Sequence, residues 1–317
     1  MATLTDAQLA EASLWLDQHI VAARQIEEKA AEAARATWLD FTAWYSAAAV
    51  AAVAREMAAL SNASQDMIVG SAQAYIGNVA AILLDTKVSI PNAKLPPVRN
   101  GAPLELVHSR PAERYKKKVA TGMTPEQAAA YAAYAAGDMQ VQDMSLVERS
   151  AQQYQMRLLG ITQFRRVVRP ELSETGSCGL CIVASDVIYN AAVLMPMHDR
   201  CKCLTMPIVG ELDPGNSLNG RDLGDFYTGL QSTQADELKK TRYQVNEHGE
   251  YGPTLTSYGH HFRGRDQVAL KDDPKRAARE LAKALPVLTR MESGGATAAE
   301  LEYQRDYVAQ LTDAVAA

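Results

Sequence analysis

The stretch from Cys178 to Cys203 reads CGLCIVASDVIYNAAVLMPMHDRCKC and contains all four cysteines of this 317-residue chain. Cysteine used only as a small apolar residue would be scattered along the sequence rather than gathered into two close pairs. Clustered cysteines beside a histidine are typical of a metal site, because thiolate and imidazole are preferred ligands of Zn²⁺. We therefore expect this stretch to fold around a metal ion.

The spacing offers five candidate ligands for about four coordination positions. Cys178 and Cys181 form a C-x2-C pair, and 19 residues separate this pair from Cys201, within the range of four-cysteine zinc sites. These three cysteines are the firmest candidates. His198 and Cys203 compete for the fourth position, and the spacing does not choose between them. Because no position is left vacant, we expect a closed structural site rather than a catalytic one.

Disulfide bonds and inert or redox thiols are the alternatives to a metal site. The chain begins Met1-Ala2-Thr3-Leu4-Thr5-Asp6, which does not read as a secretory signal, and a chain of this length does not need disulfides for stability. Inert thiols would not explain the clustering. A catalytic cysteine needs a positioned base, and His198 is better explained as a ligand or as a neighbour of one.

The residues around the cysteines resemble a known family. RRVVRPELS at 165–173 leads into GSCGLCIVAS at 176–185, and LMPMHDRCKC follows at 194–203. This arrangement is similar to the MuF-like minor head proteins of tailed bacteriophages, especially phages of actinobacteria. That family carries a C-x2-C … H-x2-C-x-C signature followed by a short strand. The match runs from Arg165 to Pro207, and the segment from Val245 to Pro253 resembles the region downstream.

The resemblance implies a structural minor capsid protein that acts in head morphogenesis, inside the capsid and near the portal, after synthesis in the host cytoplasm. It implies the portal protein as a partner, with the major capsid protein, the scaffold and packaged DNA as further candidates. A zinc-containing DNA-binding module and a head-maturation enzyme are the alternatives. Against an enzyme, the chain contains no Gly-x-Ser-x-Gly, His-Glu-x-x-His or P-loop motif.

Charge and hydropathy limit the partners further. A net charge of −5 argues against a dedicated duplex-DNA binder. We expect the run Lys116–Lys118 to be a solvated face. We expect the basic residues near the cysteines to offset thiolate charge, with contact to packaged DNA as the alternative; these residues are Arg165, Arg166, Arg169, Arg200 and Lys202. The most apolar run, from Phe41 to Ala54, has 14 residues, too few to span a membrane, so no membrane contact is expected.

The first 160 residues have a helical pattern. Thr5 and Gln8 form a capping box, and no Gly or Pro occurs from there to Leu60, which predicts one very long helix or two stacked end to end. We expect its two apolar stripes, Leu9–Ile20 and Trp38–Tyr45, to meet other molecules. Asn62 and Gln65 predict the start of a second helix, which runs to about residue 85.

Further patterns place the remaining elements. Thr124 with Pro125 and Gln127 predicts a helix that starts at residue 125, runs to about 159 and is interrupted at Gly137. Pattern and turn signals predict the other elements as follows: helices at 111–121, 182–194, 274–291 and 298–314, strands at 162–169 and 204–209, and a strand or hairpin at 242–255.

The expected fold is mainly α. It combines long N-terminal helices, a small zinc-stabilised α+β module and a helical C-terminal region. The expected segments are a long-helix region at 1–104, a helical segment at 105–161, a MuF-like zinc-binding module at 162–209, and a loop and hairpin region with C-terminal helices at 210–317. A module this small does not fold easily alone, and metal binding can contribute on the order of 10 kcal/mol to its folding.

Overall fold

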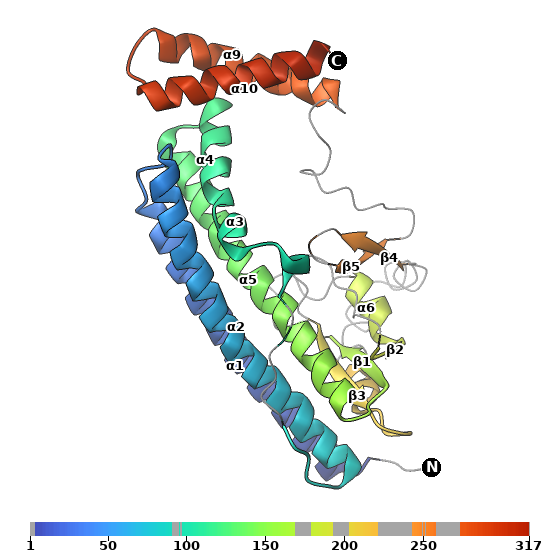
Figure 1. The fold of residues 1–317 in the computed structure, drawn as a ribbon. Coiled ribbons are helices and arrows are strands. Elements are labelled where there is room, and N and C mark those ends of the chain that lie inside the picture. The colour runs from blue at the N-terminus through green and yellow to red at the C-terminus, as the bar shows by residue number, and fades with distance from the viewer. Residues whose placement is uncertain are drawn as a thin grey trace. The chain divides into compact units, whose positions relative to one another are not determined.

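The computed structural model describes residues 4–90, 95, 97–168, 179–192, 203–220, 243–248, 250, 252–257 and 273–316. Its elements (Figure 1) are α1 (Asp6–Leu39), α2 (Ala47–Leu84), the 3-10 turn η1 (Arg99–Gly101), α3 (Leu104–His108), α4 (Arg110–Ala120), α5 (Pro125–Leu158), β1 (Gln163–Val167), α6 (Gly179–Ser185), β2 (Ile188–Asn190), β3 (Leu204–Ile208), β4 (Tyr243–His248), β5 (Gly252–Ser257), α9 (Pro274–Glu292) and α10 (Ala298–Ala316). The predicted mainly α class is confirmed.

The chain forms two compact units that interleave along the sequence. Unit 1 comprises Met1–Glu27, Ala63–Gly101 and Gln142–Phe262, and unit 2 comprises Glu28–Asn62, Ala102–Val141 and Arg263–Ala317. Each of α1, α2 and α5 therefore contributes residues to both units. The four segments expected from the sequence follow one another in chain order, whereas each unit is assembled from three separate stretches.

The chain turns back between α1 and α2, so the prediction of a single long helix, or of two helices stacked end to end, is wrong. In unit 1, Gln8 Nε2 donates to the carbonyl oxygen of Ile82 at 3.4 Å. Further along α1, His19 Nδ1 lies 2.8 Å from Ser71 Oγ. A later residue of α1 thus meets an earlier residue of α2, which makes the two helices antiparallel.

Aromatic stacking and a helix cap form this turn without Gly or Pro. The ring centroids of Trp38 and Trp44 lie 5.6 Å apart, on either side of the reversal. Ser46 Oγ then accepts a hydrogen bond from the backbone N–H of Ala49 at 3.3 Å, which is the contact of an N-cap residue. Ser46 is therefore the local signal for the start of α2.

The apolar stripes expected to meet other molecules are buried inside the protein, so that expectation is wrong. Leu16 and Ile20 lie in the core of unit 1, and Trp38 and Trp44 lie in a core of unit 2. The reversal explains this outcome, because α2 covers the apolar face that a straight helix would have exposed.

A single helix, α2, runs through Asn62 and Gln65, so the predicted helix start at these residues is wrong. Ser61 and Ser64, which flank the predicted cap, are both buried. Burial of this segment against the rest of the protein favours continuing the helix over starting a new one, since local capping preference is a weak determinant beside packing.

No apolar run long enough to span a membrane was expected from the sequence, but α2 contains a longer one. The helix contains an 18-residue window that is apolar enough to cross a bilayer by length and composition. Half of that window is buried inside the protein, which is also the pattern of a core helix in a globular protein.

The capping boxes predicted at Thr5 and at Thr124 are confirmed. The N–H of Thr5 donates to Gln8 Oε1 at 3.1 Å, and the N–H of Gln8 donates to Thr5 Oγ1 at 3.2 Å. Thr124 and Gln127 make the same reciprocal pair at 3.3 Å each. Each box satisfies two backbone N–H groups that a helix start leaves unpaired, so local sequence suffices to begin α1 and α5.

Gly137 permits close contact between α5 and α1 within unit 2, and α5 runs through it as one helix. A Cβ atom on this residue would lie 2.5 Å from Arg35 Nε, 2.9 Å from Arg35 Cγ and 3.1 Å from the backbone oxygen of Ala31. The predicted interruption of the helix is therefore wrong. The glycine is required by packing rather than by backbone geometry.

Replacing Gly137 by alanine is expected to lower the stability of unit 2 by about 1–2 kcal/mol, because the clash with Arg35 and Ala31 outweighs the gain in helix propensity. Thermal unfolding of the full chain measures this. The matched control is Gly70→Ala in α2, where an added Cβ has nothing within 4 Å. That variant is expected to stabilise by about 0.5–1 kcal/mol. A rise in melting temperature for both variants would contradict the packing role of Gly137.

The α+β part of unit 1 is a three-stranded antiparallel sheet in the order β2-β1-β3. The predicted strands at 162–169 and 204–209 are confirmed as β1 and β3, and the hairpin near 242–255 as β4 and β5. The predicted helix at 182–194 is wrong in its second half. The helix ends at Ser185, and Ile188–Asn190 pairs with β1 instead. Ala191 N–H donates to the carbonyl of Thr162 at 2.8 Å and extends this pairing.

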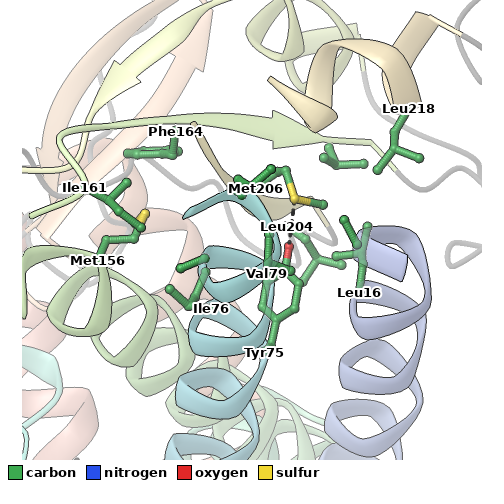
Figure 2. Close-up of a cluster of buried hydrophobic side chains, with 14 of the residues drawn as sticks. Leu16, Tyr75, Ile76, Val79, Met156, Ile161, Phe164, Leu204, Met206 and Leu218 are labelled. Carbon is green, nitrogen blue, oxygen red and sulfur yellow. Dashed lines mark hydrogen bonds between the residues drawn. The ribbon is translucent and has the colours of Figure 1, made fainter. Parts of the chain in front are cut away.

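The sheet packs its inner side chains against α1, α2 and α5 in unit 1. Figure 2 shows Leu16, Tyr75 and Met156 from the helices together with Phe164 and Met206 from the sheet. All five side chains are buried. The Tyr75 hydroxyl donates to the carbonyl oxygen of Thr205 at 2.8 Å, so one polar contact links α2 to β3 inside this apolar core.

In unit 2, the lysine run of α4 is partly exposed, and each of its three side chains also contacts another helix. Lys117 Nζ lies 3.4 Å from a carboxylate oxygen of Glu280 in α9. The Lys116 ammonium lies 5.6 Å from the ring centroid of Tyr303 in α10, and that of Lys118 lies 4.3 Å from the ring centroid of Tyr131 in α5.

The predicted helices at 274–291 and 298–314 are confirmed as α9 and α10.

Candidate metal centre

Two of the five candidate ligands lie in the described part of the chain. Cys181 is in α6 and is 3% exposed, and Cys203 directly precedes β3 and is 8% exposed. Cys178, His198 and Cys201 lie outside the described residues. Two buried sulfur donors fit the chemistry of a closed zinc site, since thiolate is the softest ligand that a protein offers to this ion.

The sheet places these two cysteines in the same small substructure. Val167 at the end of β1 pairs with Leu204 at the start of β3, so Cys203 lies beside the point where the chain leaves β1. The helix that carries Cys181, α6, packs against β1. Among the described residues, no three His, Cys, Asp or Glu side chains form a group that could hold a metal. The full ligand set therefore stays a prediction.

Asn219 completes the β1 strand where β2 is too short to do so. β2 pairs with Gln163–Arg165 only, which leaves the backbone groups of Arg166 and Val168 on that edge. Asn219 Oδ1 accepts from the N–H of Val168 at 3.1 Å, and Asn219 Nδ2 donates to the carbonyl of Arg166 at 2.7 Å. The same nitrogen lies 3.3 Å from the carbonyl of Ser185, at the end of α6. A buried amide side chain thus replaces a missing piece of strand.

The positive charge of Arg165 is paired with a carboxylate rather than with the thiolates that it was expected to offset. Its Nε and Nη2 atoms donate to Asp213 Oδ2 at 2.8 and 2.7 Å, and its Nη1 donates to the carbonyl of Ser185 at 3.1 Å. Arg166 is fully buried. The other basic residues expected near the cysteines, Arg169, Arg200 and Lys202, lie outside the described residues. Arg165 and Asn219 therefore both donate to the carbonyl of Ser185, at the end of α6.

Sequence reasoning missed the roles of Asn219 and Asp213. Both occur in turn signals, Asp213-Pro-Gly and Asn219-Gly, and such signals predict loops without naming a partner. Asp213 Oδ1 accepts locally from the N–H of Asn216 at 2.9 Å, but the other partners of these two side chains lie in residues 165–185, far away in the sequence. The shortness of β2 decides that Asn219 is needed, and that shortness emerges only from the assembled sheet.

Loss of the Asn219 amide is expected to destabilise unit 1. Asn219→Ala leaves the N–H of Val168 and the carbonyls of Arg166 and Ser185 buried without this partner, a cost of about 3 kcal/mol. Asn219→Asp keeps an acceptor for the N–H of Val168 but faces a buried carboxylate toward the carbonyl oxygens of Arg166 and Ser185, so it should destabilise unit 1 at least as much as Asn219→Ala. The control is Asn216→Ala, an exposed position in the helical stretch at 214–220 that also contains Asn219, and its stability is expected within about 0.5 kcal/mol of wild type. Equal melting temperatures for the two alanine variants would refute the role of Asn219.

A second polar cluster in unit 1 has the residue types of a hydrolase triad. His19 Nδ1 lies 2.8 Å from Ser71 Oγ, and His19 Nε2 lies 2.7 Å from Glu148 Oε1. Ser71 lies inside α2, where the helix itself uses the neighbouring backbone N–H groups, so these N–H groups cannot stabilise an oxyanion. The arrangement is better explained as a hydrogen-bonded junction of α1, α2 and α5.

No protein-family model, curated protein or solved structure matches this chain.

Proposed function

We propose that this chain is a structural minor capsid protein of a tailed bacteriophage, located inside the head near the portal, where it acts in head morphogenesis. The observation that carries the proposal is the MuF-like cysteine signature, two of whose members, Cys181 and Cys203, are buried in one sheet-and-helix substructure. One structural Zn²⁺ would be held by Cys178, Cys181 and Cys201, with His198 or Cys203 as the fourth ligand, and would join α6 to the segment that leads into β3.

The metal would have a folding role. The sheet has strands of five, three and five residues, and small sheets of this size are marginal without further support. A metal that binds thiolates of the folded state and not of the unfolded chain adds its binding free energy to stability. Buried thiols favour such a closed site over one that leaves a position for a substrate.

Protein purified without chelator is expected to contain about one Zn²⁺ per chain. Cys181→Ser should abolish stoichiometric zinc and lower the melting temperature of unit 1, because the remaining ligands cannot complete a tetrahedral site. Plasma mass spectrometry and thermal unfolding measure both. Ala184→Ser is the control, since it adds a hydroxyl at a buried position of α6 without removing a thiol. A Cys181→Ser variant that retains zinc and wild-type stability would show that the site is misassigned.

The same measurement identifies the fourth ligand. His198→Ala and Cys203→Ser remove the two competing candidates one at a time, and the variant of the true ligand loses zinc while the other retains it. Loss of zinc in both variants would mean that Cys178, Cys181 and Cys201 do not form the rest of the site as proposed.

The proposed location predicts fewer copies per virion than the major capsid protein, measured by quantitative mass spectrometry of purified particles. Deleting residues 165–207 should yield heads that lack this protein or fail to mature. Because that deletion also removes core residues of unit 1, Ile188→Lys is the sharper variant. Ile188 is 47% exposed on the edge strand β2, so its substitution leaves the core intact. Normal incorporation and infectivity with both variants would exclude this module as the anchor in the head.

The two alternatives have less support. A DNA-binding module needs exposed positive charge to bind phosphates. The net charge of −5 and the contacts that Lys116–Lys118 make within unit 2 leave less of it. For a head-maturation enzyme, the Ser71, His19 and Glu148 cluster has hydrolase residue types but no oxyanion donors beside Ser71. A mobility shift that weakens steeply with salt would favour the DNA-binding alternative.

A further inference from the structure

Unit 1 contains a cavity of about 490 Å³ that the proposed capsid role does not use. One wall is formed by the segment that ends at Gly101, a second wall is formed by residues of α5, and Glu250 also lines the cavity. The volume falls within the range of small-molecule sites. Among the described residues, its lining includes the carboxylate of Glu250 and three arginines, Arg99, Arg149 and Arg157. Arg99 is paired with carboxylates, so the guanidinium groups of Arg149 and Arg157 on α5 are the ones that favour an anionic ligand.

A buried ion cluster holds the first wall in place. Arg99, Asn100 and Gly101 all have left-handed backbone angles, with φ of 56°, 51° and 78°. Two successive non-glycine residues in this region are unfavourable unless tertiary contacts hold them. Arg99 supplies these contacts, because its Nε donates to Asp143 and its Nη1 donates to Glu250 at 2.9 Å. The carboxylate in the lining is thus already paired with a guanidinium.

The second wall presents a row of polar groups on one face of α5. Arg149, Ser150, Gln153, Tyr154 and Arg157 all line the cavity, and their spacing of three and four residues places them along one side of the helix. Arg149 is buried, whereas Arg157 is exposed. Arg157 makes no ion pair with any residue in the part of the chain that the structure describes. Guanidinium groups bind phosphate oxygens through paired N–H donors, and hydroxyl groups add further donors.

We propose that this cavity binds an organic phosphate of nucleotide size. Arg149 and Arg157 bind the phosphoryl oxygens. Ser150, whose hydroxyl donates to the carbonyl of Leu146 at 3.1 Å, and Tyr154 line the cavity between them along the helix. The apolar part of the lining, which includes Leu95 and Leu146, contacts the organic portion of the ligand. The site does not involve the cysteine cluster, so it stands or falls separately from the zinc and capsid proposals.

Isothermal titration calorimetry of the full chain at low ionic strength tests this inference with adenosine monophosphate, inorganic phosphate and adenosine. Adenosine monophosphate should bind saturably, phosphate more weakly, and adenosine not at all. Arg157→Gln should weaken the binding of adenosine monophosphate by about tenfold, the effect of losing one charge-assisted contact. Arg149→Gln should weaken it further. Arg24→Gln removes the same charge at an exposed position of α1 in the same unit and outside the lining, and should leave the affinity unchanged.

A further arm separates a free nucleotide from a nucleic-acid end that carries the same group. A short oligonucleotide with a 5′-phosphate that competes with adenosine monophosphate, when its 5′-hydroxyl counterpart does not, would support the site and identify a terminus as its ligand. If adenosine monophosphate does not bind wild type saturably, or if Arg157→Gln binds it as tightly as Arg24→Gln does, the inference is overturned. Since Arg157 is exposed, its variant stays informative even if Arg149→Gln does not fold.

Discussion

The Tyr75 hydroxyl, buried beneath the sheet, donates to the backbone of β3 at Thr205, and the α+β part of unit 1 depends on this contact with the helices. A sheet of three short strands is marginal alone and must pack its apolar face on another element. Tyr75 supplies both a large apolar ring and a single polar contact that selects the register of β3 against α2. The net value of such a bond is only about 1 kcal/mol, but an unpaired carbonyl in this core would cost more.

The position of Tyr75 depends in turn on the junction of the long helices. The imidazole of His19 stacks on the Tyr75 ring with centroids 5.0 Å apart, and Ser71 and Glu148 hold the imidazole from α2 and α5. Gln152 also lies within 3.3 Å of Glu148. Polar groups buried among helices are costly unless they are satisfied together, so this cluster permits only a narrow range of helix registers. The order of contacts runs from Glu148 through His19 and Tyr75 to β3, next to Cys203.

Short-range patterns predicted the beginnings and types of most elements. The Thr5 and Thr124 capping boxes, the strands β1 and β3, and the two C-terminal helices follow from groups that lie within a few residues of one another. The cysteine cluster could also be found this way, because ligand spacing is a local property. The elements that were predicted wrongly each depend on a distant partner: α2 covers the stripes of α1, β1 recruits Ile188–Asn190 as a strand, and Arg35 requires Gly137.

Local sequence patterns were therefore enough to predict the helical class, the caps and the clustering of the four cysteines, since these depend on backbone hydrogen bonding and residue types over short distances. Four features depend on the folded arrangement: the reversal after Leu39, the assembly of each unit from three stretches, the use of Asn219 to complete β1, and the cavity beside Arg99. In each of these cases, the deciding contact joins residues far apart in the chain. Such contacts form only when folding buries the two groups and excludes water, and the local sequence does not predict which distant group will be the partner.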